Sequence, residues 1–240
     1  MNTPGISVII TGATGMVGEG VLHECLHSPA IASVLVVNRK SVGISHPKLK
    51  EIIHTDFYNL SPVESQLSGY DACFFCLGVS SIGLKEEAYT KLTYTLTMHV
   101  AETLNKLNKS MTFCYVSGAG TDDTEKGKSM WARVKGKTEN DLMKLSFKKV
   151  FAFRPGFIKP IKGLTRAHPF YKYVLWMYPL GRALFPTGFC TLQELAHAMI
   201  YTATVGYDKS VLEGKNIIEL GNKFQDKISG VNQESEIFAR

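Results

Sequence analysis

The sequence SVIITGATGMVG at positions 7–18 decides the fold. A run of apolar and β-branched residues ends at Thr11, glycines follow as Gly12, Gly15 and Gly18, and an apolar helical pattern begins at once. The first glycine allows a tight turn, the second lets the backbone approach a pyrophosphate, and the third lets the helix pack on the strand. Because the motif joins a predicted strand to a predicted helix, it predicts a dinucleotide-binding α/β fold rather than an ordinary glycine turn.

Short β-branched runs alternate with longer helical patterns along the rest of the chain. The strands are expected at residues 6–10, 33–37, 51–54, 72–76, 111–116 and 150–153, and the longest helices at 86–107 and 131–145. Thr191-Leu192-Gln193-Glu194 is a capping-box pattern, which predicts a further helix to about Thr204. This alternation predicts a doubly wound Rossmann fold, with a mostly parallel sheet and helices on both faces.

The composition indicates one large globular domain. The chain has 240 residues, of which 45% are hydrophobic and 20% charged. We expect a single nucleotide-binding domain over residues 1–221, with a last strand at 216–220 and a loose polar tail at 222–240. Residues 157–190 are rich in aromatic side chains and are expected to form a small segment that covers the substrate.

Charge and cysteine content restrict the partners and the compartment. The 27 basic and 21 acidic residues leave a net charge of +6, which suits an anionic cofactor as well as a nucleic acid. Basic residues at 126–149 are interleaved with acidic ones, as on a solvated helix, so we expect no nucleic-acid binding. The five cysteines lie in apolar surroundings and no cationic leader precedes them, which predicts a cytoplasmic location without disulfides.

The end of the second predicted strand indicates which dinucleotide binds. It reads Val37-Asn38-Arg39-Lys40, at the place where the adenosine ribose would lie. The acid that would bind the ribose hydroxyls of NAD is missing, and two cations stand where a 2′-phosphate would be. The sequence therefore favours NADP over NAD, the alternative being that Arg39 and Lys40 belong to a solvated strand end.

Two further patterns have structural explanations. His23-Glu24-Cys25-Leu26-His27 matches a zinc-protease motif, but both histidines fall opposite the core-facing stripe of their helix and toward the end away from the glycine loop. Cys73 and Cys76 are spaced so that they point to opposite faces of a strand. We expect no metal site and assign these cysteines to core packing.

Over about residues 6–205, the chain resembles the atypical short-chain dehydrogenases/reductases, near the Tat-interacting oxidoreductase-like and epimerase/dehydratase-like proteins. The motifs that carry the resemblance are the glycine loop, Asp56-Phe57, Cys76-Leu77-Gly78, Ser117, Lys135 and Arg154-Pro155-Gly156. The cofactor-binding residues that it implies are Gly12, Thr14, Gly15, Met16, Val17, Asn38, Arg39, Lys40, Asp56, Phe57, Leu77, Gly78, Val79, Lys135, Pro155, Gly156, Phe157 and Ile158. Among these, Asp56 and the Phe57 backbone would hold adenine, and residues 155–158 would line the nicotinamide.

The resemblance also implies a serine, a tyrosine and a lysine as catalytic residues. Ser117 and Lys135 match, but the tyrosine position is occupied by Trp131, whose indole can donate a hydrogen bond but cannot exchange a proton. None of the ten tyrosines has a lysine four residues later. The proton donor is therefore left open between Lys135, a bound water and Tyr115, which shares the strand face of Ser117.

This departure leaves two functions. The first is an NADP-dependent oxidoreductase with altered proton delivery, acting on an unknown hydrophobic carbonyl or alcohol as a monomer or homodimer. The second is a non-catalytic NADP-binding protein that senses redox state or serves as a scaffold.

Residues 157–190 are interpreted first as a lid or pocket wall, with a subunit interface and a peripheral membrane contact as alternatives. The aromatic candidates in this segment are His168, Phe170, Tyr171, Tyr173, Trp176 and Tyr178.

Overall fold

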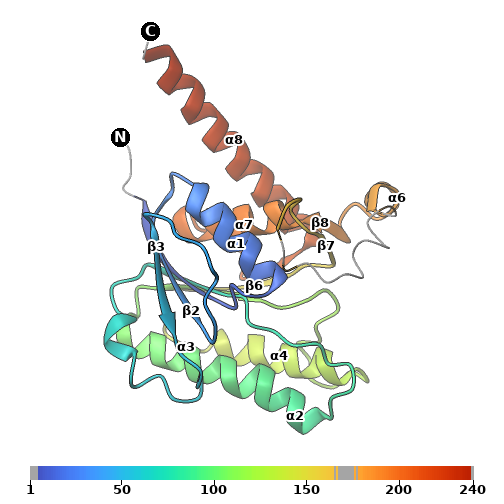
Figure 1. The fold of residues 1–240 in the computed structure, drawn as a ribbon. Helices are drawn as coiled ribbons and strands as arrows, with labels where there is room; N and C mark the ends of the chain where they lie inside the picture. The colour runs from blue at the N-terminus through green and yellow to red at the C-terminus, as the bar shows by residue number, and fades with distance from the viewer. Residues whose placement is uncertain (1–4, 165, 167–175, 177, 239–240) are drawn as a thin grey trace.

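The centre of the computed structural model is a seven-stranded sheet in which every neighbouring pair of strands is parallel (Figure 1). The strand order is β3-β2-β1-β4-β5-β6-β9. The strands are β1 (Ile6–Thr11), β2 (Ile31–Asn38), β3 (Leu49–Ile53), β4 (Ala72–Phe75), β5 (Thr112–Val116), β6 (Lys149–Arg154) and β9 (Val211–Glu213). The structure describes residues 5–164, 166, 176 and 178–238, with side chains through residue 230. The predicted doubly wound Rossmann fold is confirmed.

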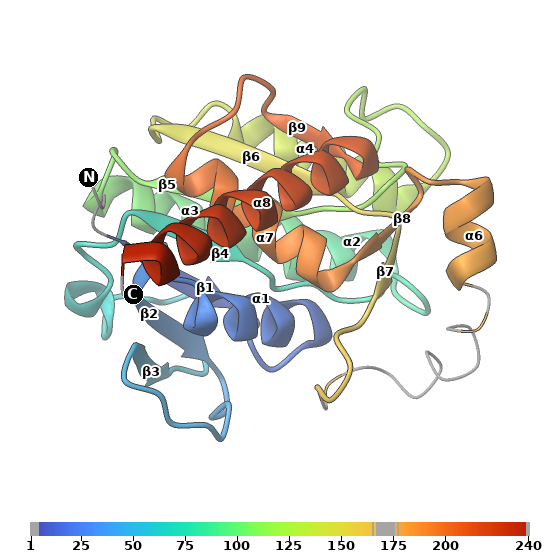
Figure 2. The same cartoon turned by 90° about the horizontal axis from the view of Figure 1, so that it is seen from above.

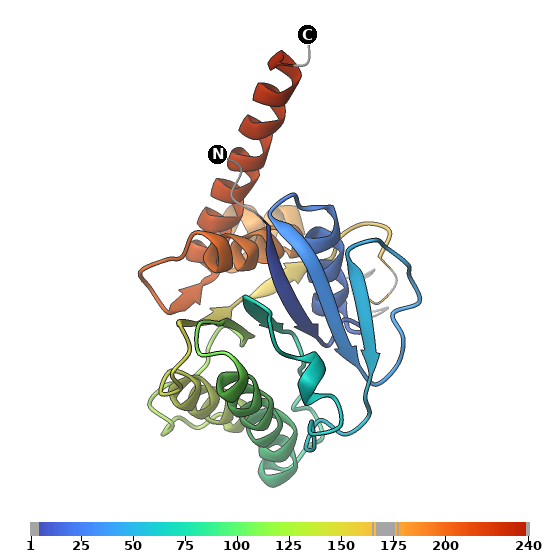
Figure 3. The ribbon, with the colours of Figure 1, turned by 90° about the vertical axis from the view of Figure 1, so that its left-hand side faces the viewer.

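Helices cover both faces of the sheet (Figure 3). The first layer contains α1 (Met16–His27), α7 (Leu192–Thr204) and α8 (Gly214–Phe238). The second layer contains α2 (Glu86–Thr90), the π-helical turn η2 (Lys91–Thr95), α3 (Leu96–Leu107) and α4 (Met130–Leu142). The crossover from β3 to β4 holds the 3-10 turn η1 (Glu64–Gln66). Successive strand residues alternate between the layers, so Ile10 packs in the first core and Ile9 in the second. The helix predicted at 86–107 is present with a π-helical turn inside it, and the one predicted at 131–145 ends at Leu142.

The capping box predicted at Thr191 is confirmed. Thr191 Oγ1 accepts a hydrogen bond from Glu194 N at 3.0 Å, and Glu194 Oε2 accepts one from Thr191 N at 2.7 Å. These two bonds satisfy backbone donors that the first turn of α7 would otherwise leave free. The start of α7 is therefore fixed at the residue that the sequence indicated.

The C-terminal residues correct two sequence predictions. The strand expected at 216–220 and the loose tail expected at 222–240 are replaced by the helix α8, which continues past the body of the domain (Figures 1 and 3). Ile217, Leu220 and Phe224 recur at helical spacing and are buried in the core of the first layer. A short apolar run does not by itself distinguish a buried strand from a helix, and here the burial of one helical stripe decides.

A small substructure stands beside the main sheet (Figure 2). It contains the parallel pair β7 (Phe157–Lys159) and β8 (Phe189–Thr191), together with the short helix α6 (Tyr178–Leu184). Of the aromatic candidates in this segment, Trp176 and Tyr178 are described, whereas His168, Phe170, Tyr171 and Tyr173 lie outside the described residues.

Candidate cofactor and active site

The glycine loop has the backbone that the motif predicts. Gly12 has a φ of +75°, and a Cβ there would lie 2.8 Å from the Cys76 carbonyl. A Cβ on Gly18 would lie 2.2 Å from the Gly12 carbonyl oxygen, because α1 packs directly on the loop. At Gly15, by contrast, the nearest described atom would be Gly12 O at an ordinary 3.4 Å. The loop is therefore closed toward the protein and open above Gly15, as a cradle for an anionic group requires.

The first turn of α1 faces this opening. Gly15 is its N-cap residue, and within the described residues no side chain caps the helix. The side chains of Met16 and Val17 pack against the core, so their backbone N–H groups, rather than their side chains, remain for a ligand. Uncapped N–H groups and the helix dipole together favour a phosphate at this position. Thr14, half-buried in the loop, precedes the turn.

Asn38 links the end of β2 to the glycine loop. Its Oδ1 accepts a hydrogen bond from Ala13 N at 3.2 Å, whereas its Nδ2 is buried and has no partner among the described residues. An orphaned buried donor beside an open anion cradle fits a ligand that carries acceptor oxygens. The next residues, Arg39 and Lys40, are exposed and form no ion pair within the described part of the chain.

The candidate adenine-binding residues follow β3 and β4 at the same edge of the sheet. Asp56 is exposed, and its Oδ1 accepts a hydrogen bond from Tyr58 N at 2.9 Å. The Phe57 ring is buried in the core of the second layer, which leaves its backbone for contact with a ligand. Leu77 packs against that core, while Gly78 and Val79 are exposed after β4. The topology thus brings these segments together, and their role toward adenine stays a prediction.

The loop after β5 presents Ser117 at the carboxyl edge of the sheet. Ser117 N donates to Phe153 O at 2.7 Å, and Ser117 Oγ lies 3.0 Å from Thr121 Oγ1. The hydroxyl of Thr121 donates to Gly118 O at 2.8 Å, so the proton between the two hydroxyls belongs to Ser117. The Ser117 oxygen therefore keeps its lone pairs for a donor on a substrate. Sequence reasoning did not name Thr121 as a site residue. The available signal was its hydroxyl side chain, four positions after Ser117.

Trp131 and Lys135 lie one turn apart on the same face of α4. The Trp131 indole lies beside the loop after β5, with Cη2 3.6 Å from where a Cβ on Gly120 would be. Lys135 Nζ lies 3.5 Å from Val116 O and 5.3 Å from the centre of the Tyr115 ring. Burial lowers the pKa of Lys135 to about 8, so this ammonium group can release and regain a proton near neutral pH.

Tyr115 does not fit the role of substitute acid. Its side chain is fully buried in the core of the second layer, where the ring packs on Phe75. Burial raises the pKa of its hydroxyl well above the ordinary value. The ring instead provides an aromatic surface beneath the ammonium group of Lys135.

A buried ion pair holds α4 against the end of β6. Arg154 Nη2 lies 2.6 Å from Glu139 Oε2, and Arg154 Nε lies 3.1 Å from both Glu139 oxygens. A second acceptor, Glu213 from β9, lies 3.1 Å from Arg154 Nη1. Because Glu139 is one turn after Lys135, this pair positions the helix that carries both Trp131 and Lys135. Arg154 belongs to one of the motifs that carry the family resemblance, but the sequence did not indicate that Glu139 is its partner.

Residues 155–158 are divided between the site and the core. Pro155 O accepts a hydrogen bond from Ala119 N at 2.9 Å, which joins this segment to the loop after Ser117. Gly156 is partly exposed, and Phe157 packs its ring 5.4 Å from that of Phe189. Ile158 is buried in the core of the first layer. Their contact with the nicotinamide stays a prediction, and for Ile158 the available group is the backbone.

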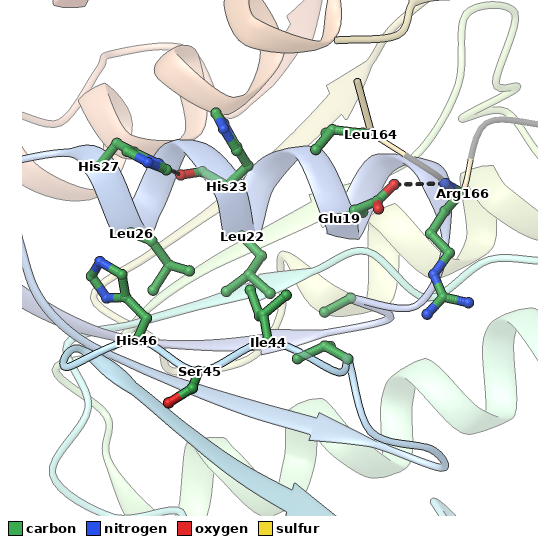
Figure 4. Close-up of a pocket in the computed structure, with 12 residues that line it drawn as sticks. Glu19, Leu22, His23, Leu26, His27, Ile44, Ser45, His46, Leu164 and Arg166 are labelled. Carbon is green, nitrogen blue, oxygen red and sulfur yellow. Dashed lines mark hydrogen bonds between the residues drawn. The ribbon is translucent and has the colours of Figure 1, made fainter. Parts of the chain in front are cut away.

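The zinc-protease-like pattern has a structural role. Glu24 is buried, and its Oε2 lies 2.8 Å from His197 Nε2 on α7, which lowers the Glu24 pKa against the opposing effect of burial. His23 and His27 instead lie at a cavity of about 220 Å³ between α1 and the loop at 42–46 (Figure 4). In the described part of the chain, no group of three or more His, Cys, Asp or Glu side chains is arranged to hold a metal ion.

The fold and the glycine loop together define a Rossmann-type nucleotide-binding protein. The sequence matches the NAD dependent epimerase/dehydratase family over residues 8–129. The chain belongs to this family. It is also 25% identical to the protein HTATIP2 of Rattus norvegicus over 154 residues, and 28% identical to the mitochondrial protein FMP52 of Candida albicans over 155 residues. Each match covers 63% of this chain but 62% and 66% of the relatives, less than two thirds of either.

Solved structures show the same fold at low sequence identity. The Bordetella bronchiseptica enzyme WbmF, in complex with NAD+, superposes with a TM-score of 0.65 at 18% identity, covering 94% of this chain and 79% of that protein. The ADP-L-glycero-D-manno-heptose-6-epimerase of Helicobacter pylori also gives 0.65, at 16% identity and with 93% and 84% covered. At these identities the likeness concerns the fold.

The comparisons contradict the predicted cytoplasmic location. Fungal relatives, including those of Candida albicans and Emericella nidulans, are named as mitochondrial proteins. All five cysteines are free, as the sequence indicated. Free thiols argue against a disulfide framework but do not distinguish one reducing compartment from another, so the cysteine content could not decide the location.

Proposed function

We propose that the chain is an NADP-dependent oxidoreductase in which Lys135 exchanges the proton that a tyrosine exchanges in related enzymes. The observation that carries the proposal is the partly buried Lys135 ammonium group beside Val116 O at the carboxyl edge of the sheet, with its pKa lowered to about 8. Ligands of open parallel sheets bind at this edge, and the glycine loop opens onto it. A group that titrates near neutral pH at this place is suited to general acid–base catalysis.

The preference for NADP rests on the end of β2. Position 38 is an amide whose oxygen is already bound by Ala13 N, so it cannot act as the carboxylate that binds both ribose hydroxyls. Arg39 and Lys40 follow at once, exposed and without an ion-pair partner in the described residues. Two cations in this position favour a phosphorylated ribose.

The side chains at the site have distinct roles in this reaction. When bound, the nicotinamide cofactor supplies or takes the hydride. In the direction of carbonyl reduction, Lys135 Nζ gives a proton to the substrate oxygen, and in alcohol oxidation it takes that proton back. Ser117 Oγ, whose own proton is directed to Thr121, can accept a hydrogen bond from a substrate donor other than the hydroxyl whose proton Lys135 exchanges. The indole N–H of Trp131 donates a hydrogen bond but holds its proton throughout.

The surroundings of the site favour a hydrophobic substrate. Phe157, Tyr178 and Phe189 form an aromatic cluster with ring centres 5.4–6.2 Å apart, on the segment that follows β6. Trp131 adds a further aromatic surface beside Gly118 and Gly120 of the loop after β5. Pockets with largely aromatic walls and few polar groups accept apolar molecules. The substrate class proposed is therefore a hydrophobic aldehyde, ketone or alcohol.

Trp131 also supports a second candidate function. Because indole cannot exchange a proton, a chain that bound NADP without turning it over would have the same residue at this position. Such a protein would sense the redox state of the cofactor or serve as a scaffold. The oxidoreductase and the non-catalytic protein differ in whether NADPH is consumed.

Replacing both Arg39 and Lys40 by alanine is expected to weaken NADPH binding by about tenfold or more and to leave NADH binding within about twofold, because the lost contacts are to the 2′-phosphate. Isothermal titration calorimetry with both cofactors measures the effect. Lys50→Ala, which removes an exposed cation from the neighbouring strand β3, is the matched control. Equal affinity of the native chain for NADPH and NADH would contradict the proposed preference.

Replacing Trp131 by tyrosine tests the enzyme function directly. The change places an ionisable hydroxyl four residues before Lys135, so NADPH oxidation with a panel of aldehydes and ketones is expected to rise by about tenfold or more. Absorbance of NADPH at steady state gives the rate, and Trp131→Phe, which has no hydroxyl, controls for the loss of indole. If NADPH binds but neither the native chain nor Trp131→Tyr turns over, the non-catalytic function is favoured instead.

A further inference from the structure

Exposed apolar side chains lie on the helix α6 and immediately beside both of its ends. Trp176 is 74% exposed, Leu180 59%, Leu184 63% and Phe185 65%. Leu180 and Leu184 lie one turn apart on one side of α6, while Trp176 precedes the helix and Phe185 follows it directly. We call these four residues the α6 face. Large apolar side chains that gather in this way on a protein surface mark a site of interaction.

The other side of α6 is fixed to the domain. Tyr178 is buried and packs against Phe157 and Phe189, with ring centres 6.2 and 6.0 Å away. Arg182 Nη2 lies 2.7 Å from Glu194 Oε1 at the start of α7. Both the aromatic cluster and the ion pair hold the helix so that the α6 face points away from the sheet, and α6 lies at the periphery of the molecule in two perpendicular views (Figures 1 and 2).

The segment around the α6 face is uniformly basic. Residues 157–190 contain five Lys and Arg side chains and no Asp or Glu. Lys159, Lys162 and Arg166 are exposed, and Lys159 Nζ lies 4.9 Å from the centre of the Tyr178 ring. Among the described residues, Glu194 is paired with Arg182 of this segment, and Glu19 accepts a hydrogen bond from Arg166 N.

We propose that the α6 face docks on the surface of an anionic lipid membrane. Apolar and aromatic side chains enter the boundary between headgroups and acyl chains, while flanking cations stay at the negative surface. A second copy of the chain fits less well, because it would bring two basic segments together. In the described residues, no helix has both the length and the apolar content to cross a bilayer, so the contact is a peripheral one.

The test is sedimentation of the full chain with vesicles of phosphatidylcholine alone and of phosphatidylcholine with phosphatidylserine. We expect binding to the anionic vesicles and not to the neutral ones. The triple variant Leu180→Ser, Leu184→Ser, Phe185→Ser is expected to bind at least about tenfold more weakly, because it removes most of the inserted apolar surface. Replacing Lys159 and Lys162 by alanine is expected to weaken binding by about fivefold each.

Tryptophan emission provides a second readout. The chain has two tryptophans, Trp131 and Trp176, so a blue shift on adding anionic vesicles that disappears in Trp176→Phe locates the contact at the α6 face. Ile53→Ser and Val205→Ser remove exposed apolar residues from β3 and the end of α7 and are the matched controls; both are expected to bind as the native chain does.

Three outcomes would overturn the proposal. The first is absence of binding to the anionic vesicles, and the second is equal binding by the native chain and the triple variant. The third is a dimer in analytical ultracentrifugation that the triple variant abolishes while vesicle binding stays the same, since the α6 face would then join two copies of the chain. An unchanged Tm of the triple variant shows that the fold is retained.

Discussion

Replacing Lys135 by methionine is expected to lower NADPH-dependent turnover by between about 100-fold and about 10,000-fold, the range for removal of a general acid. Methionine keeps the apolar stem and fills the same space next to Tyr115 but has no proton to give. Steady-state rates with the best substrate of the carbonyl panel measure the loss. Retained turnover in the variant would exclude Lys135 as the proton donor and leave a bound water in that role.

Two matched variants separate proton transfer from other roles of this lysine. Lys135→Arg keeps the positive charge, but guanidinium holds its proton at all pH values of interest, so cofactor binding should survive while turnover is lost. Lys137→Met removes an exposed lysine from the same helix, where it pairs with Asp141 at 2.9 Å, and should leave the rate within about twofold. If Lys137→Met loses as much turnover as Lys135→Arg, the losses would be explained by distortion of α4 rather than by a lost proton transfer.

The pH dependence follows from the direction of the pKa shift. Carbonyl reduction needs the protonated ammonium group, so its rate should be constant below pH 8 and fall as the pH rises through the Lys135 pKa of about 8. Alcohol oxidation needs the neutral amine and should rise over the same interval. The residual rate of Lys135→Arg should show no inflection near pH 8 in either direction.

The same shift predicts an effect on stability. The unfolded chain binds a proton at this lysine up to its ordinary pKa of 10.5, so the fold gains stability as the pH rises from about 8 to 10.5 and bears the full desolvation penalty below about 8. Lys135→Met removes that penalty, and its free energy of unfolding at pH 7 should exceed that of the native chain by about 2 kcal/mol. Urea denaturation at pH 7 and pH 10 measures the difference, which should shrink at the higher pH.

The fold could be predicted from the sequence because its determinants are local. The glycine loop is read from residues 7–18, the strands from short β-branched runs, and the start of α7 from Thr191 and Glu194. The strand predicted at 216–220 was wrong because its apolar residues are equally compatible with a helix until their burial against α7 is known.

The sequence named candidate site residues but not the contacts between them. Ser117 and Lys135 were named as candidates from the family resemblance, whereas the hydrogen bond from Ser117 to Thr121 and the buried pair of Glu139 with Arg154 depend on how loops and helices pack. The lowered Lys135 pKa also arises from desolvation beside the end of β5, which no local pattern encodes. Sequence thus proposes the chemical groups of the site, while packing determines their protonation and orientation.

Replacing Glu139 by glutamine is expected to lower the free energy of unfolding by about 3–5 kcal/mol, because it leaves the Arg154 guanidinium buried without its main counter-charge. Glu139 is 2% exposed and Arg154 9%, and their closest atoms lie 2.6 Å apart. Burial disfavours the charged guanidinium, but its hydrogen bonds with Glu139 outweigh burial and raise the Arg154 pKa. Chemical denaturation at neutral pH measures the loss.

Two control variants distinguish a buried ion pair from ordinary packing. Glu213, which also contacts Arg154 but is 53% exposed, should lose less than about 1 kcal/mol as Glu213→Gln, because solvent screens its charge. The double variant Glu139→Leu, Arg154→Met should be more stable than Glu139→Gln, since no charge then remains buried. Its catalytic rate should nevertheless fall, because the pair fixes the part of α4 that carries Lys135. A double variant with native turnover would show that the position of Lys135 does not depend on this ion pair.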